Sequence, residues 1–151
     1  MLLASYKAGI AFTQSYVGYV HGVAHSLGGR YGIAHGLANA VILPHFLRAY
    51  GAKIHPKLAK LARLAGIAGT NQSDADAAAA FIDWVDDMNQ RMGIPKYIEG
   101  IDVADTPQMA KNADAESNPL YPVPVLMDVY QLQHMYYVVG GMMAENDTFS
   151  A

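Results

Sequence analysis

Runs of apolar residues at helical spacing, separated by glycine and proline, most constrain how this chain of 151 residues can fold. No run shows the alternation of apolar and polar residues that is typical of a half-buried β-strand, and there is no internal repeat. Between Leu2 and Ser26 there is no proline, and small and apolar residues predict one long, largely buried helix. Gly28 and Gly29 then favour a left-handed ending for that helix. The sequence as a whole predicts an all-α fold.

Five further helices are predicted after this one. They are expected at residues 35–50, 55–66, 73–92, from 106 onward and at 125–139. Pro44 would lie inside the first of these, and we expect a kink or an interruption near His45, because proline removes a backbone donor from a helix interior. Gly51 supplies the stop for the same helix.

Two of the expected helices begin with residues that favour a helix start. Ser73 can act as the N-cap of the helix at 73–92, and acidic residues follow in its first turn. Thr106 and Pro107 can act as the N-cap and first residue of the next helix. The stripe expected to face the core in 73–92 consists of Phe81, Trp84, Val85 and Met88. Residues 118–124 are expected to form an extended, proline-rich loop.

Composition excludes several classes of function. Ten basic and thirteen acidic residues give a formal net charge of −3, and no basic stripe suggests a nucleic acid partner. The longest apolar tract, residues 37–47, is well short of the roughly 20 residues that span a bilayer, so we expect no membrane partner. Without cysteine, any metal must be held by nitrogen and oxygen ligands. With 52% hydrophobic residues and no sign of secretion, we expect one compact cytoplasmic domain.

Four of the six histidines are gathered in residues 20–45, where they form a candidate site. His21 and His25 are four residues apart, so a continuous helix places them on one face. The spacing is similar to the HExxH zinc motif, but Gly22 stands where that motif has its glutamate, which excludes a metalloprotease. A second helix that returns along the first could bring His35 to the same centre. Taken alone, the tract offers two or three nitrogen ligands. A helical pair such as His21 and His25 is more often structural or on the surface than metal-binding.

The run from Ala8 to His45, AGIAFTQSYVGYVHGVAHSLGGRYGIAHGLANAVILPH, closely resembles the signature region of the iron-dependent alcohol dehydrogenase family, also called group III or iron-activated. The resemblance continues through residues 92–95 and 118–124 and covers almost the whole chain. It implies the C-terminal helical bundle of that family, which is dehydroquinate synthase-like. The N-terminal α/β domain, which binds NAD(H) or NADP(H) in the family, has no counterpart here. We therefore expect residues 1–151 to be one helical metal-binding domain of a larger two-domain enzyme.

The resemblance also implies roles for individual residues. His21 and His35 match two metal ligands of the family, and His25 matches a histidine that lies near the nicotinamide and the substrate. His25 would therefore be a catalytic and cofactor-binding residue that orients the cofactor or relays a proton. Phe12 could line the substrate pocket. The family's other two ligands, an aspartate and a histidine, would fall upstream of Met1, so half of the metal site is expected to be absent.

Other candidate residues have alternative interpretations. Residues 114–119 resemble a segment that approaches the substrate pocket in the family, and they are equally well explained as a surface loop. His45 is expected to pack or cap locally rather than to coordinate a metal. His55 and His134 are expected to be ordinary surface or interface residues.

Two functions follow from this reading. The first is the C-terminal metal-binding part of an NAD- or NADP-dependent alcohol dehydrogenase, which interconverts alcohols with aldehydes or ketones by metal-assisted hydride transfer. Its metal would be a divalent cation, with iron(II) expected in preference to zinc(II). The isolated chain would not catalyse the reaction by itself. The alternative is an inactive helical module that binds metal weakly or mediates protein association, as a homo-oligomer or with the missing nucleotide-binding domain.

Overall fold

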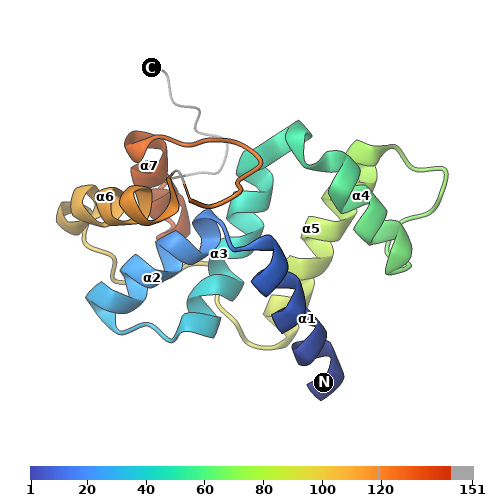
Figure 1. Cartoon of the computed structure of the whole chain (residues 1–151), viewed down its shortest axis with the longest axis horizontal. Helices are drawn as coiled ribbons and strands as arrows, with labels where there is room; N and C mark the ends of the chain where they lie inside the picture. The colour runs from blue at the N-terminus through green and yellow to red at the C-terminus, as the bar shows by residue number, and fades with distance from the viewer. Residues whose placement is uncertain (119, 144–151) are drawn as a thin grey trace.

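The computed structural model describes residues 1–118 and 120–143, and all regular structure in that part of the chain is helical (Figure 1). In chain order the elements are α1 (Leu2–Ser15), α2 (Tyr19–Tyr31), α3 (His35–Tyr50), the 3-10 turn η1 (Gly51–Lys53), α4 (His55–Leu64), α5 (Asp74–Arg91), the 3-10 turn η2 (Val103–Asp105), α6 (Thr106–Ser117) and α7 (Val129–Val139). The expectation of an all-α fold is confirmed.

The expectation of one long helix from Leu2 to Ser26 is wrong, because the chain breaks between α1 and α2. Tyr16 adopts a left-handed φ of 60°, and Gly18 is extended with a φ of −143°. The expected ending at Gly28 and Gly29 is also wrong, since α2 continues to Tyr31. The residue that ends α2 is Gly32, whose φ is 67° and whose N–H donates to the carbonyl of Gly28 at 2.9 Å.

The bounds of α3 agree with the sequence, from His35 to a stop at Gly51, but Pro44 does not interrupt it. A proline at this position leaves the carbonyl of Ala40, one turn earlier, without its helical donor. The buried side chain of Asn89, on α5, supplies a replacement: its Nδ2 donates to the Ala40 oxygen at 2.8 Å. The contact between α3 and α5 therefore compensates for the proline.

The start of α5 is as predicted, and its buried face is predicted in part: Val85 is buried and Phe81 packs against the core. Ser73 is the N-cap and accepts from the backbone N–H of Asp76 at 3.1 Å. The buried residues of the helix are Ala77, Ala78, Ile82, Val85 and Asn89, whereas Trp84 is 42% exposed. Because Trp84 is two positions beyond Ile82, it lies on nearly the opposite side of the helix. The expected core position of Trp84 is therefore wrong.

The last two helices differ from the prediction at their starts. Thr106 opens α6, but its hydroxyl donates to the carbonyl of Val103 at 2.9 Å and does not cap the helix. α7 begins four residues later than expected, after Asp128. The Asp128 carboxylate accepts from the N–H of Gln131 at 2.8 Å, and the Gln131 side chain accepts from the N–H of Asp128 at 2.9 Å, which makes a capping box. In the expected loop at 118–124, Pro119 lies outside the described residues.

The helices pack as a set of neighbouring pairs around one main core. α2 lies against α3 and α6, α6 lies against α7, and α4 lies against α5 (Figure 1). The largest fully buried side chains of the described part are Tyr19, Tyr136, Phe46, Leu27, Ile42 and Leu132. Among the described residues, no helix has both the length and the apolar character needed to cross a bilayer.

Helix α1 is the exception to this packing. None of its 14 residues is buried, and it projects from the body of the molecule toward the N-terminus (Figure 1). Its large apolar side chains are exposed, namely Leu2, Leu3, Tyr6, Ile10 and Phe12. The ring of Tyr16, which follows the helix, is exposed as well. The helix therefore presents an apolar surface that the described residues leave uncovered.

Candidate functional site

Three imidazole rings from α2 and α3 gather at one place. The ring centres of His21 and His25, one turn apart on α2, are 6.0 Å apart. The centre of His35, the first residue of α3, is 5.3 Å from that of His21 and 5.2 Å from that of His25. The link of residues 32–34 is short enough to bring α3 back beside α2. We call these three residues the histidine cluster.

The ring-centre distances from His35 to His21 and to His25 are both compatible with two ligands of one metal ion, so the distance alone does not select the pair. A metal–nitrogen bond of about 2.1 Å places a metal about 3.2 Å from an imidazole centre, so a tetrahedral site spaces two ring centres about 5.3 Å apart. The observed distance from His35 to His21 is 5.3 Å. Within residues 1–118 and 120–143, however, no group of three or more His, Cys, Asp and Glu side chains is arranged to hold a metal ion. A complete site would therefore need ligands beyond this cluster.

The surroundings of His21 favour its neutral form. Burial lowers the pKa of His21 below its usual value, and the neighbouring His35 and His25 lower it further, while Glu116 acts in the opposite direction. A neutral imidazole is the form that can coordinate a metal. The electrostatic environment of His21 is therefore compatible with the role of a ligand.

His35 has a polar neighbour on its own helix. The Nδ2 of Asn39, one turn further along α3, lies 3.0 Å from the Nε2 of His35 and donates to the His35 carbonyl at 2.9 Å. Asn39 therefore lies against the His35 ring, and a metal bound at Nε2 of His35 would have to take the place of this amide. In the sequence, the i, i+4 spacing of Asn39 from His35 is the signal that could have identified it as a neighbour of the cluster.

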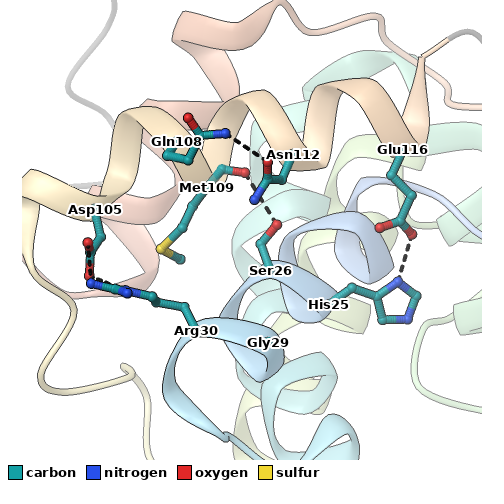
Figure 2. A pocket seen from close by; sticks show the side chains of 9 residues that line it. All are labelled: His25, Ser26, Gly29, Arg30, Asp105, Gln108, Met109, Asn112 and Glu116. Carbon is teal, nitrogen blue, oxygen red and sulfur yellow. Dashed lines mark hydrogen bonds and ion pairs between the residues drawn. The ribbon is translucent and has the colours of Figure 1, made fainter.

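His25 makes a close contact with a residue of α6 (Figure 2). Its Nδ1 lies 2.6 Å from Oε1 of Glu116, and the hydroxyl of Tyr121 donates to the same oxygen at 2.8 Å. Both residues of this contact are partly exposed, with 44% of the His25 side chain and 33% of the Glu116 side chain open to solvent. Sequence reasoning points to the segment 114–119 but misses Glu116 and Tyr121 as partners of His25.

A groove of about 530 Å³ runs between α2 and α6, beside the histidine cluster. It is lined by His25, Ser26, Gly29, Arg30, Asp105, Gln108, Met109, Asn112 and Glu116 (Figure 2). Its polar groups include an imidazole, a guanidinium, two carboxylates and two amides. His25 therefore belongs both to the cluster and to one end of this groove.

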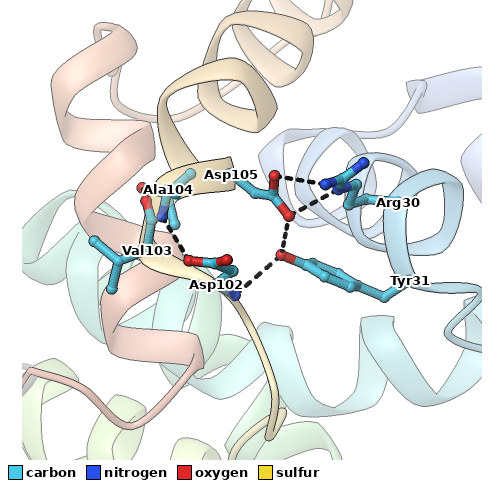
Figure 3. Close-up of polar contacts among 7 residues, drawn as sticks. Arg30, Tyr31, Asp102, Val103, Ala104 and Asp105 are labelled. Carbon is cyan, nitrogen blue, oxygen red and sulfur yellow. Dashed lines mark hydrogen bonds and ion pairs between the residues drawn. The ribbon is translucent and has the colours of Figure 1, made fainter.

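The other end of the groove is closed by a network of polar contacts (Figure 3). Arg30 binds Asp105 through two parallel hydrogen bonds, Nε to Oδ2 at 2.7 Å and Nη2 to Oδ1 at 2.8 Å. The hydroxyl of Tyr31 donates to Asp105 at 2.8 Å and accepts from the N–H of Asp102 at 3.0 Å. The hydrogen bond from Arg30, followed by that from Tyr31, lowers the pKa of Asp105. This network ties the end of α2 to the start of α6.

Two further residues of the sequence analysis lie away from the cluster. His45 is 2% exposed, its Nε2 lies 3.1 Å from the carbonyl of Lys96, and its ring stacks on Tyr97 with centres 5.6 Å apart. It packs locally, as expected. Phe12 is on α1, where it is 57% exposed, and it does not line the groove.

Comparison with known proteins places this arrangement in a family. Residues 1–137 match the family model for the C-terminal part of Fe-containing alcohol dehydrogenases. The chain belongs to the iron-containing alcohol dehydrogenase family. The matched residues include those of both the histidine cluster and the groove between α2 and α6.

Individual relatives agree with this assignment. The chain is 43% identical over 126 residues to 1,3-propanediol dehydrogenase of Klebsiella pneumoniae, covering 79% of this chain and 32% of the relative. It is 36% identical over 115 residues to lactaldehyde reductase of Escherichia coli (strain K12), covering 75% and 30%. A solved structure of a 1,3-propanediol oxidoreductase superimposes with a TM-score of 0.79 at 34% identity, covering 87% of this chain and 35% of that one. The chain thus spans about a third of the length of these relatives and matches their C-terminal helical part.

Proposed function

We propose that this chain supplies the helical, metal-binding part of an NAD- or NADP-dependent alcohol dehydrogenase that interconverts small alcohols with aldehydes or ketones. The observation that carries the proposal is the 5.3 Å spacing of the His21 and His35 rings on two adjacent helices. Membership of the family supports it, as do relatives named for propanediol and lactaldehyde. On this proposal, residues 1–151 act as one helical domain beside a nucleotide-binding region.

The three residues of the histidine cluster would have different roles. His21 and His35 would hold a divalent metal, iron(II) or zinc, with nitrogen ligands suited to either. When bound, the metal acts as a Lewis acid on the substrate oxygen, and the nicotinamide exchanges hydride with the substrate carbon. His25 would orient the cofactor or move a proton at its Nε2, because Glu116 occupies the other ring nitrogen.

Metal uptake by the chain tests this proposal. Iron(II) under anaerobic conditions, and separately zinc(II), are titrated calorimetrically into the wild type and into H21A and H35A. Each substitution is expected to weaken metal binding by at least about tenfold, because it removes a nitrogen ligand. H55A is the matched control, since His55 lies on α4, outside the cluster. Unchanged affinity in both H21A and H35A would overturn their role as ligands.

A second candidate function is that of an association module, with a second copy of the chain or with a nucleotide-binding domain. It is favoured by α1, which buries none of its residues and exposes its large apolar side chains. A helix of 14 residues is only marginally stable alone in water, so a covering surface would stabilise it.

Sedimentation analysis separates this candidate from the first. I10K places a charge on the apolar surface of α1 and is expected to lower the self-association of the chain, whereas S15K, at an exposed position about 140° around the same helix from Ile10, should leave it unchanged. Equal association of both variants and the wild type would remove α1 from the interface. Conversely, oxidation of an alcohol with reduction of NAD or NADP by the isolated chain would contradict the hypothesis that it is an inactive module.

A further inference from the structure

We infer that Glu116, held by Tyr121, is a positioning residue that fixes His25 as the tautomer with its proton on Nδ1 and a free lone pair on Nε2. The inference concerns the donor and acceptor pattern of one imidazole ring. Its importance for catalysis rests on the proposed function, but the tautomer can be measured without metal, cofactor or substrate.

The contact itself determines which atom carries the proton. A carboxylate oxygen can only accept a hydrogen bond, so the Nδ1 of His25, 2.6 Å from Oε1 of Glu116, must donate. A separation this short is typical of a hydrogen bond assisted by charge. In the neutral ring one nitrogen is a donor and the other an acceptor, so Nε2 becomes the acceptor. Figure 2 shows the second ring nitrogen of His25 on the side turned away from Glu116.

Glu116 is itself held from two directions. Tyr121, in the segment after α6, donates to the same Oε1 at 2.8 Å, so that this oxygen receives two donors. Helix α6, which carries Glu116, packs closely on α2. The closeness is seen at Gly22 of α2, where an added Cβ would lie 2.3 Å from Oγ of Ser117. These contacts keep the carboxylate in reach of His25, although a third of the Glu116 side chain is open to solvent.

The free Nε2 has a defined place in the molecule. Glu116 contacts the ring of His25 at its Nδ1 edge, while His35 stacks against the face of the ring with centres 5.2 Å apart and an angle of 21° between the ring planes. A bound group that carries an O–H or N–H donor, such as an alcohol, can therefore donate to Nε2. With the opposite tautomer, Nε2 would itself be a donor, and an alcohol could contact it only by accepting through its oxygen. Glu116 therefore determines that Nε2 of His25 accepts a hydrogen bond from a bound group and does not donate one.

Nitrogen NMR of the imidazole rings tests the inference, because the two tautomers of neutral histidine differ in their ¹⁵N shifts. We measure the metal-free wild type at about pH 9, where an ordinary histidine of pKa about 6.5 is neutral. His25 is expected to be mainly protonated on Nδ1. In E116L, which removes the acceptor, most of this population should be lost. E99L is the control, since Glu99 is an exposed glutamate away from the cluster.

An internal reference is present in the same spectra. The Nε2 of His45 must donate to the carbonyl of Lys96, so His45 should carry its proton on Nε2 in every variant. A wild-type His25 protonated mainly on Nε2, or an unchanged tautomer in E116L, would overturn the inference. The wild-type spectrum decides by itself if E116L does not fold.

The outcomes for the inference and for the proposed function are distinguishable. An unchanged tautomer together with metal uptake that depends on His21 and His35 overturns only the role of Glu116. A tautomer that shifts in E116L, in a chain whose metal uptake is unaffected by H21A and H35A, overturns only the metal site. Y121F provides a further check, because loss of its hydrogen bond to Glu116 should lower the Nδ1-protonated population by less than E116L does.

Discussion

Replacing Gly22 by alanine tests the close packing of α2 on α6. A Cβ at this position would lie 2.3 Å from Oγ of Ser117 and 3.4 Å from the carbonyl oxygen of Ala113. The first distance is too short for any contact between a carbon and an oxygen, while the second is normal. Ser117 is fully buried, and its Oγ has no hydrogen-bond partner among the described residues. The serine hydroxyl is therefore the atom that must move.

Two effects of opposite sign determine the change in the free energy of unfolding. Alanine is favoured over glycine in a helix interior by about 1 kcal/mol. Insertion of a methyl group into a packed interface costs about 1–3 kcal/mol. G22A should therefore be destabilised by about 0–2 kcal/mol. In an S117A background the nearest atoms would be the carbonyl oxygen of Ala113 at 3.4 Å and the former serine Cβ at 3.7 Å, both at ordinary contact distance, so the same substitution should stabilise the protein by about 1 kcal/mol.

Urea unfolding of four proteins measures this difference: the wild type, G22A, S117A and the double variant, followed by far-ultraviolet circular dichroism. We expect a coupling energy of about 1–3 kcal/mol between the two sites, with S117A alone neutral or stabilising because the Ser117 hydroxyl has no hydrogen-bond partner in the described part of the chain. Additivity within about 0.5 kcal/mol would show that Gly22 and Ser117 are not in contact, and the packing of α2 on α6 would be wrong.

Three further predictions concern other contacts. D128A should lower the free energy of unfolding by about 1 kcal/mol in urea titrations, because it removes the capping box of α7. L132A, at a fully buried position, should cost about 2–5 kcal/mol in the same assay, whereas L126A, at an exposed position, should change it by less than about 0.5 kcal/mol. Since Arg30 lowers the pKa of Asp105, this carboxylate contributes stability above its usual pKa of about 3.8, which is lost as pH falls through the lowered value. The difference in stability between the wild type and D105N should therefore be largest near neutral pH and shrink below pH 4, and a difference that is constant with pH would contradict this.

The sequence predicts the elements whose boundaries depend on nearby residues. The start of α5 at Ser73 and the end of α3 at Gly51 were predictable because the cap and the stop lie at the helix ends themselves. The common face of His21 and His25 follows from helical periodicity in the same way.

Features that depend on distant residues could not be predicted. The continuity of α3 through Pro44 depends on Asn89, which is 49 residues from the carbonyl that it satisfies. The contact of Glu116 with His25 joins residues 91 positions apart. The break after α1 depends on a left-handed Tyr16, a conformation for which a tyrosine gives no signal.

Because the link between α2 and α3 is short, the positions of the three histidine rings depend on the number of residues between His21 and His35. Each residue added to a helix rotates everything that follows by about 100°, so an insertion between His21 and His25 would move the two rings to different faces. An insertion at residues 32–34 would shift α3, and with it His35, relative to α2. The segment 66–72 between α4 and α5 can change length without moving any of these rings. Related chains that keep this site should therefore vary in length at 66–72 and remain constant in length from His21 to His35.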